Sequence, residues 1–300
     1  MVKYPGVRDF AGLFLLPGLA AILPWRLCFR IFHRLAGMDF LYRSEVEAAL
    51  AGVACFAPPV DKAAWSKASR LVWLVDHADL YLSRFRSDAW LYRNVTVTGD
   101  WPVDDNFIAI TFHWGTGMWA LRHMRAHGRK VSVLVRGLER ASFSGTLLRY
   151  VYGKLRLLVT AQAGGDCLTM AGSKSLYDMK RKLKGGSCIV GLLDVPTDSP
   201  RNVLAAQFLG RTAYFPRGLL FLAVNSGVPV VLYSMGVDRN TGHRHLVISD
   251  PLTTHSEQAL LDTLAGRLTE LVAQDSPAWH HWGGVQSFFQ KGFFKATDAS

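Results

Sequence analysis

The 300-residue sequence has few cysteines and lacks several common catalytic motifs. Its four cysteines are scattered, with no C-x-x-C pair, which argues against a disulfide framework and favours free thiols in a reducing compartment. There is no P-loop and no G-x-S-x-G nucleophile elbow, so neither a nucleoside triphosphatase nor a serine hydrolase is supported. The histidine pairs lack further ligands at metal-binding spacing, so no metal site is expected.

Acidic side chains are also scarce relative to basic ones. The sequence has 23 Asp and Glu against 34 Lys and Arg, a net charge of +11. A charge of this sign indicates anionic partners, such as phosphates, anionic lipid or an acidic carrier protein. Nucleic acid is not expected, because the sequence has no zinc-finger spacing, basic heptad or RNA-binding aromatic motif.

The N-terminal region has an apolar stretch that is short for a membrane span. Residues 10–25 carry no charge, but a spanning helix needs roughly 20 residues. Arg26, Arg30 and Arg34 then recur at helical spacing beside Trp25. This pattern predicts a membrane-anchor or interfacial segment over 1–38, with these four residues at the lipid. The alternative is a buried first helix with a solvated arginine edge.

The remaining sequence indicates an α/β fold. Residues 39–90 have helical spacing of apolar positions, whereas short β-rich runs alternate with helices from Val95 onward. The run 156–159 is a candidate strand in this part. We predict a mixed, largely parallel sheet sandwiched by helices. The expected division is an anchor over 1–38, a helical segment packing on the core over 39–90, an α/β domain over 91–292 and a C-terminal tail over 293–300.

Three predicted strands each end at a charged or reactive residue. His113 follows the run 107–112, Arg136 follows 131–135, and Asp194 follows 187–193. Ligands gather at the carboxyl ends of strands in open α/β sheets, so these residues suggest a site with a base, a cation and a carboxylate. The alternative is that strand ends meet solvent and carry polar residues for that reason.

Glycine-rich turns suggest where an anion could bind. Gly115, Thr116 and Gly117 precede a predicted helix, whose free N–H groups can face an oxyanion or a phosphate. The same turn fits the dinucleotide-binding pattern G-x-G-x-x-A, which is the competing interpretation. Arg217 and Gly218 precede another apolar helix and fit a phosphate or carboxylate contact, although a solvated loop arginine would look the same.

The chain resembles the lysophospholipid acyltransferase superfamily, and within it the late acyltransferases of lipid A biosynthesis. The resemblance covers about 95–290. Blocks in the family's order carry it: 95–99 before the strand that leads to His113, then 133–136, 191–194, 206–213, 218–223, 227–231 and 276–282.

The resemblance implies an enzyme at the cytoplasmic face of the cell inner membrane. Such an enzyme moves an acyl group from acyl carrier protein or a coenzyme A thioester to a hydroxyl or amine of a membrane lipid, without a cofactor. The family motif is His, four residues, then Asp or Glu. Here His113 is present as the general base, but Met118 occupies the acid position.

We therefore expect a membrane-associated acyltransferase in which Asp194 is structural or substitutes for the missing acid. Gly115, Thr116 and Gly117 would lie beside the transition-state oxygen or a phosphate. Arg136 and Arg217, with Gly218, would bind the anionic group of the acceptor. One alternative is a weak or inactive relative that binds lipid or acyl carrier; a less favoured one is an NADP-binding protein with its loop at 115–120.

Overall fold

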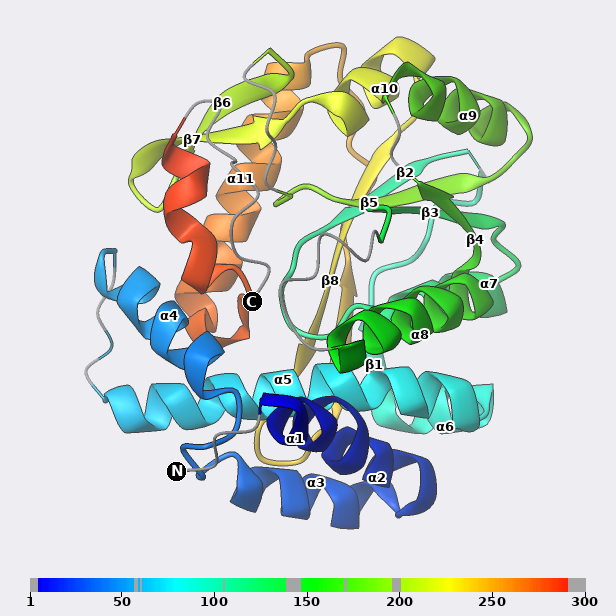
Figure 1. Ribbon diagram of the computed structural model, residues 1–300. Helices are drawn as coiled ribbons and strands as arrows, with labels where there is room; N and C mark the ends of the chain where they lie inside the picture. The colour runs from blue at the N-terminus through cyan, green and yellow to red at the C-terminus, as the bar shows by residue number, and fades with distance from the viewer. Residues whose placement is uncertain are drawn as a thin grey trace.

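The structure is a computed structural model that describes residues 5–56, 59, 61–104, 106–138, 147–169, 172–195 and 201–290. The chain folds as mixed α/β, with a seven-stranded, mostly parallel sheet between helices (Figure 1). The predicted fold class is confirmed at this level.

The main sheet has the strand order β1-β9-β8-β2-β5-β3-β4, and a separate hairpin pairs β6 with β7. All neighbouring strands in the main sheet are parallel except β8 and β9. The strands are β1 (Val95–Thr98), β2 (Ile108–Thr111), β3 (Val131–Val135), β4 (Gly165–Thr169), β5 (Cys188–Leu192), β6 (Val203–Phe208), β7 (Arg211–Pro216), β8 (Val230–Val237) and β9 (Arg244–Ile248).

Helices pack on both faces of this sheet. One hydrophobic core joins the sheet to helices α5, α7 and α8, and a second joins it to α9, α10 and α11. These helices are α5 (Lys62–Phe85), α7 (Met118–Ala126), α8 (Leu147–Gly164), α9 (Gly172–Lys184), α10 (Gly218–Ser226) and α11 (Glu257–Gln274); the short α6 (Asp88–Asn94) precedes β1. The predicted strand at 156–159 is wrong, because these residues lie inside α8 and the next strand begins at Gly165.

The apolar run that leads to His113 explains how β2 supports both cores. Phe107 and Ala109 lie in the first core, while Ile108 and Ile110 lie in the second. Successive side chains of a strand point to opposite faces, so a continuous apolar run is what a strand covered on both sides requires.

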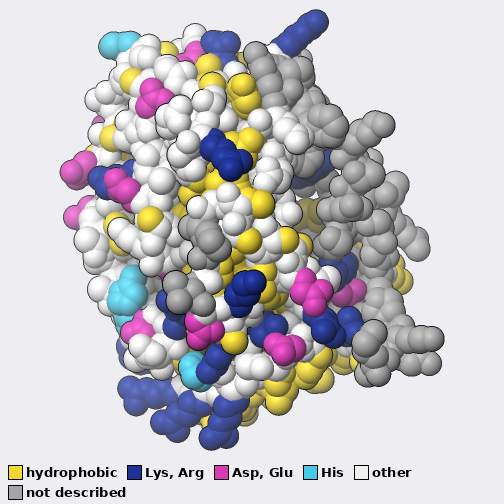
Figure 2. Space-filling view, turned by 90° about the vertical axis from the view of Figure 1, so that its left-hand side faces the viewer, with side chains coloured by type: hydrophobic (Ala, Val, Ile, Leu, Met, Phe, Trp, Pro, Cys, Tyr) yellow, Lys and Arg dark blue, Asp and Glu magenta, His cyan; other side chains and the backbone are white. Residues whose placement is uncertain are grey.

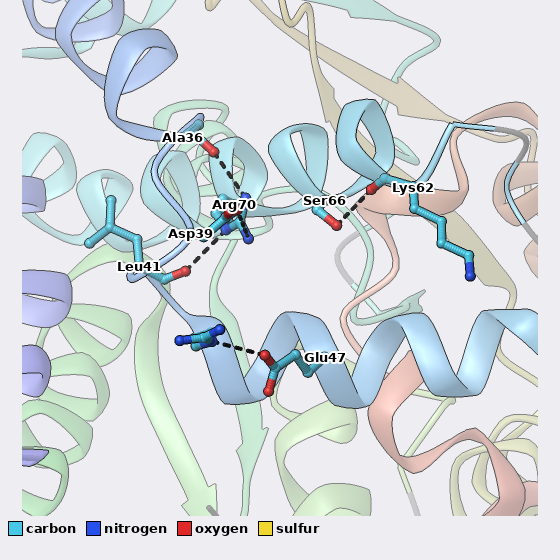
Figure 3. A network of polar contacts seen from close by, with 8 residues as sticks. Ala36, Asp39, Leu41, Glu47, Lys62, Ser66 and Arg70 are labelled. Atoms are coloured by element: carbon cyan, nitrogen blue, oxygen red, sulfur yellow. Dashed lines mark hydrogen bonds and ion pairs between the residues drawn. The ribbon is translucent and has the colours of Figure 1, made fainter. Parts of the chain in front are cut away.

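The N-terminal helices pack against α5 rather than standing apart from the domain (Figure 1). They are α1 (Pro5–Asp9), the π-helix η1 (Phe10–Leu15), α2 (Leu16–Ile22), α3 (Trp25–Leu35) and α4 (Arg43–Ala54). Arg70 of α5 holds the connection between α3 and α4 in place through polar contacts. Its guanidinium donates to the carbonyl oxygens of Ala36 and Leu41 and pairs with Asp39 at 2.8 Å (Figure 3). No helix in the described part of the chain is long and apolar enough to cross a bilayer.

The C-terminal part returns to the carboxyl end of the sheet through two short helical turns. They are the 3₁₀ helices η3 (Ser276–Ala278) and η4 (Trp282–Phe289), and η4 packs on α4. The segment between them, residues 279–281, reaches the site described next.

Candidate functional site

Sheet topology brings three of the predicted site residues to the same edge. Strands β2, β5 and β3 are consecutive and parallel, so their carboxyl ends lie side by side. His113, Asp194 and Arg136 follow these three strands. The three strand ends therefore lie at one edge of the sheet, and their use as one functional site stays a prediction.

His113 and Asp194 form a hydrogen-bonded pair at this edge. Nδ1 of His113 lies 3.0 Å from Oδ1 of Asp194, and the backbone N–H of His113 lies 2.9 Å from both carboxylate oxygens. Trp279 also donates its indole N–H to Oδ2 at 2.8 Å. Asp194 is fully buried, whereas the side chain of His113 is 35% exposed. The pair thus joins an inaccessible carboxylate to an accessible imidazole.

The surroundings of Asp194 keep it ionised. Burial raises its pKa, but the electrostatic interaction and hydrogen bond with His113, together with the hydrogen bond from Trp279, outweigh burial and lower the pKa to about 2. An ionised carboxylate only accepts hydrogen bonds, so Nδ1 of His113 carries the proton in this contact. In the neutral form of His113, Nε2 is then the ring nitrogen with the lone pair, which is the arrangement of a histidine base held by a carboxylate.

A second histidine lies against His113. The ring centroids of His113 and His281 are 4.1 Å apart in an edge-to-face arrangement. Burial is the main cause that lowers the pKa of His281 to about 3, and the charge on His113 lowers it further. His281 is therefore neutral near pH 7. Its Nε2 is buried and has no hydrogen-bond partner among the described residues.

The segment around His280 holds the loop that carries His113. The backbone N–H of His280 donates to the carbonyl of His113 at 2.8 Å, and Nε2 of His280 lies 2.8 Å from the carbonyl oxygen of Gly115. Gly115 in turn donates to the carbonyl of Ala278 at 2.9 Å. The sequence analysis assigned no site role to Ala278 or His280. Both lie in the block 276–282, which was noted only as part of the family resemblance.

The glycine turn is only partly available to a ligand. The N–H groups of Gly115 and Thr116 already donate to Ala278 and Met235. Gly115 has φ +66°, and a Cβ there would lie 2.0 Å from the carbonyl oxygen of Met235, so only glycine fits. The N–H groups of Gly115 and Thr116 are therefore used within the protein, and the predicted place of this turn beside a reacting oxygen or a phosphate depends on the helix start that follows it. Gly117 and Met118, at the start of α7, have N–H groups without an intrahelical acceptor.

The same observation disfavours the dinucleotide interpretation. A G-x-G-x-x-A loop binds pyrophosphate because its backbone N–H groups are free to face the phosphates. Here the first two N–H groups of the turn are bonded within the protein.

Met118, at the family's acid position, belongs to the hydrophobic interior. It is the first residue of α7, is buried, and is part of the core that includes Trp119 and Ala120. Asp194, from a neighbouring strand, provides the carboxylate contact to His113 instead.

The predicted anion-binding arginines differ in their surroundings. Arg136 is exposed after β3, and it has no ion pair among the described residues. Arg217 forms a two-point ion pair with Glu257, with Nη2 lying 2.8 Å from Oε1. Gly218 begins α10 directly after it. An anionic acceptor group would therefore have to compete with Glu257 for the guanidinium of Arg217.

His113, Asp194 and His281 also form the one group in the described ranges that could hold a metal ion. Their potential ligand atoms lie within 4.8 Å of one another. The carboxylate of Asp194, however, already accepts hydrogen bonds from His113 and Trp279. These donors would compete with a metal, so the contacts fit a histidine–carboxylate pair better.

The predicted membrane-contacting residues of α3 divide into two groups. Trp25 is buried and donates its indole N–H to the carbonyl of Gly242 at 3.0 Å, so its predicted lipid contact is wrong. Arg26, Arg30 and Arg34 are exposed as expected. Figure 2 shows Lys and Arg side chains gathered beside hydrophobic ones at the lower end of the molecule, where α3 lies in Figure 1.

No protein-family model matches the sequence, and no curated protein matches it either. The resemblance to the acyltransferase superfamily therefore rests on the residue blocks alone.

Proposed function

We propose that this protein is a membrane-associated acyltransferase. It would move an acyl group from an acyl thioester, carried by acyl carrier protein or coenzyme A, to a hydroxyl or amine of a lipid-like acceptor. The observation that carries the proposal is the contact between His113 and the buried, ionised Asp194. Asp194 thereby provides the carboxylate that the family motif places at the position of Met118.

In this proposal His113 is the general base. Its Nε2 takes the proton of the acceptor hydroxyl or amine while the acceptor oxygen or nitrogen attacks the thioester carbonyl. The tetrahedral intermediate then collapses, the C–S bond breaks, and the imidazolium returns the proton to the leaving sulfur. Asp194 orients the ring through Nδ1 and stabilises the imidazolium by its charge. Neutral His281 adds no positive charge beside that imidazolium.

Two further groups have proposed roles. The N–H groups of Gly117 and Met118 at the start of α7 would stabilise the developing oxyanion. The exposed Arg136, one strand beyond Asp194, would bind an anionic group of the acceptor. Location at the cytoplasmic face of the inner membrane follows from the family resemblance and is part of the proposal.

The test is thioester consumption by the purified full chain in the presence of membrane lipid extract. Release of free thiol would be followed with time, and mass spectrometry of the lipids would identify the acylated product. We expect turnover by the wild type and loss of it in His113→Ala. His245→Ala, which changes an exposed histidine on β9, is the matched control and should keep full activity. Equal background rates in wild type and His113→Ala would instead favour a binding protein.

A further inference from the structure

A pocket lies beside the N-terminal helices α2 and α3. It has a volume of about 470 Å³, within the roughly 300–1,000 Å³ typical of small-ligand sites. The turn between α2 and α3 and the helix α6 form it, at the lower right of Figure 1. None of its lining residues belongs to the site around His113.

Three arginines from separate elements converge on this pocket. Arg26 comes from α3, Arg86 from the end of α5 and Arg93 from α6, and no carboxylate lines the pocket. Elsewhere in the described ranges, Arg70, Arg156 and Arg244 are each paired with an acid. Three guanidinium groups without an acid repel one another, and an anion between them would remove that repulsion.

The hydrogen bonds of these arginines leave donors unused. Arg86 donates through Nη2 to the carbonyls of Ala20 and Leu23, at 2.9 and 2.7 Å, but its Nε is buried without an acceptor. Arg26 and Arg93 are exposed and have no ion pair within the described part of the chain. The exposed guanidinium groups of Arg26 and Arg93 therefore keep N–H donors that an anionic ligand could use.

Apolar side chains accompany the positive charge. Trp25 and Trp90 line the pocket with their rings 6.3 Å apart, and Ile22 beside them is 76% exposed. Guanidinium groups match the geometry of phosphate oxygens, and exposed aliphatic side chains match the apolar part of a lipid.

We propose that this arginine pocket binds the phosphate group of an anionic phospholipid. Arg26, Arg86 and Arg93 hold the phosphate, while Ile22 faces the glycerol and acyl region. The site is independent of the acyl-transfer proposal, because it uses none of the same residues and needs no turnover.

The test measures equilibrium binding of a short-chain phospholipid to the full chain by calorimetry. Dihexanoyl phosphatidylglycerol would be used below the concentration at which it forms micelles, so that no charged surface is present. Inorganic phosphate and zwitterionic dihexanoyl phosphatidylcholine are the two comparison ligands. Salt is kept at about 0.15 M, where exposed charges more than about 8 Å apart are largely screened.

Two double variants separate the pocket from general positive charge. The pocket variant is Arg26→Gln with Arg93→Gln; the control is Lys130→Gln with Lys184→Gln, which removes the same charge from exposed positions outside the pocket. We expect the pocket variant to weaken phosphatidylglycerol binding by about tenfold or more, and the control by less than about threefold. Thermal unfolding of both variants would check that they fold as the wild type does.

Three results would overturn the proposal. Equal loss in the two variants would show that only diffuse charge attracts the lipid. Equally tight binding of phosphatidylcholine would show that net negative charge is not required. Equally tight binding of inorganic phosphate would show that the pocket takes a free anion and not a lipid.

Discussion

Nδ1 of His113 lies 3.0 Å from Oδ1 of Asp194, although 81 positions separate the two residues in the chain. The contact exists because β2 and β5 are adjacent and parallel and both residues follow the carboxyl ends of their strands. In the resembled family the acid follows its histidine by five positions on the same loop and helix. In this protein a neighbouring strand supplies the carboxylate.

The first prediction concerns Asp194→Asn. Asparagine keeps the size of the side chain but removes the charge that, in the proposed mechanism, stabilises the imidazolium and fixes the tautomer of the neutral imidazole. Loss of a triad aspartate costs roughly 10⁴-fold in rate, and we expect a loss of similar order here. Thioester turnover measures it, and circular dichroism would show whether the fold is retained. Full activity in a folded Asp194→Asn protein would exclude Asp194 from the mechanism.

Met118→Glu gives the second prediction. Placing the family's acid at this position would restore the motif in sequence, but Met118 is buried in an apolar core. Burying a carboxylate there without a partner should lower the free energy of unfolding by about 3 kcal/mol or more. Met118→Leu, which keeps the volume, should cost less than about 1.5 kcal/mol. Urea unfolding compares the two; a stable Met118→Glu protein with higher turnover would contradict our assignment of the acid to Asp194.

The positions of His113 and Asp194 at strand ends could be predicted from the sequence. A short apolar run followed by His113, and another followed by Asp194, were enough to expect both residues at the carboxyl edge of a sheet. The direct contact between them depends on strand order. Nothing in the local sequence fixes β5 as the neighbour of β2, so Asp194 was only a candidate partner.

Other features were predicted wrongly or not at all, because the local sequence is compatible with more than one structure. Trp25 lies on the aromatic face of an arginine-rich helix, and that face serves a membrane or a protein core equally well; here it packs on the core. The run 156–159 is too short to separate a strand from part of a helix by periodicity. The contacts of residues 278–281 to the His113 loop have no periodic signal, because they arise in an irregular segment between two 3₁₀ helices.

The indole N–H of Trp279 gives the third prediction. It donates to the ionised Asp194, and a hydrogen bond to a charged group contributes about 1.5–3 kcal/mol. Trp279→Phe should lower the unfolding free energy by about this amount and raise the pKa of Asp194, since the Trp279 hydrogen bond helps to lower it. Trp282→Phe is the matched control. Its ring is equally buried, but its N–H donates to the neutral carbonyl of Ser276, so the loss should be about 0.5–1.5 kcal/mol. Equal losses in the two variants would argue against an ionised Asp194.

The fourth prediction is a loss of stability in mild acid. Burial lowers the pKa of His77 to about 3 and that of His123 to about 4, both from an ordinary value of 6.5. At a pH between the folded pKa and 6.5, each histidine is protonated in the unfolded chain but neutral in the folded one. The free energy of unfolding therefore falls as the pH falls below about 6.5. Each histidine should contribute a slope of about 1.4 kcal/mol per pH unit. Urea unfolding from pH 7.5 to 4.5 measures this slope. It should be shallower in His77→Gln and unchanged in His245→Gln, which alters an exposed histidine. An identical slope in wild type and His77→Gln would show that His77 does not stay neutral in the folded protein.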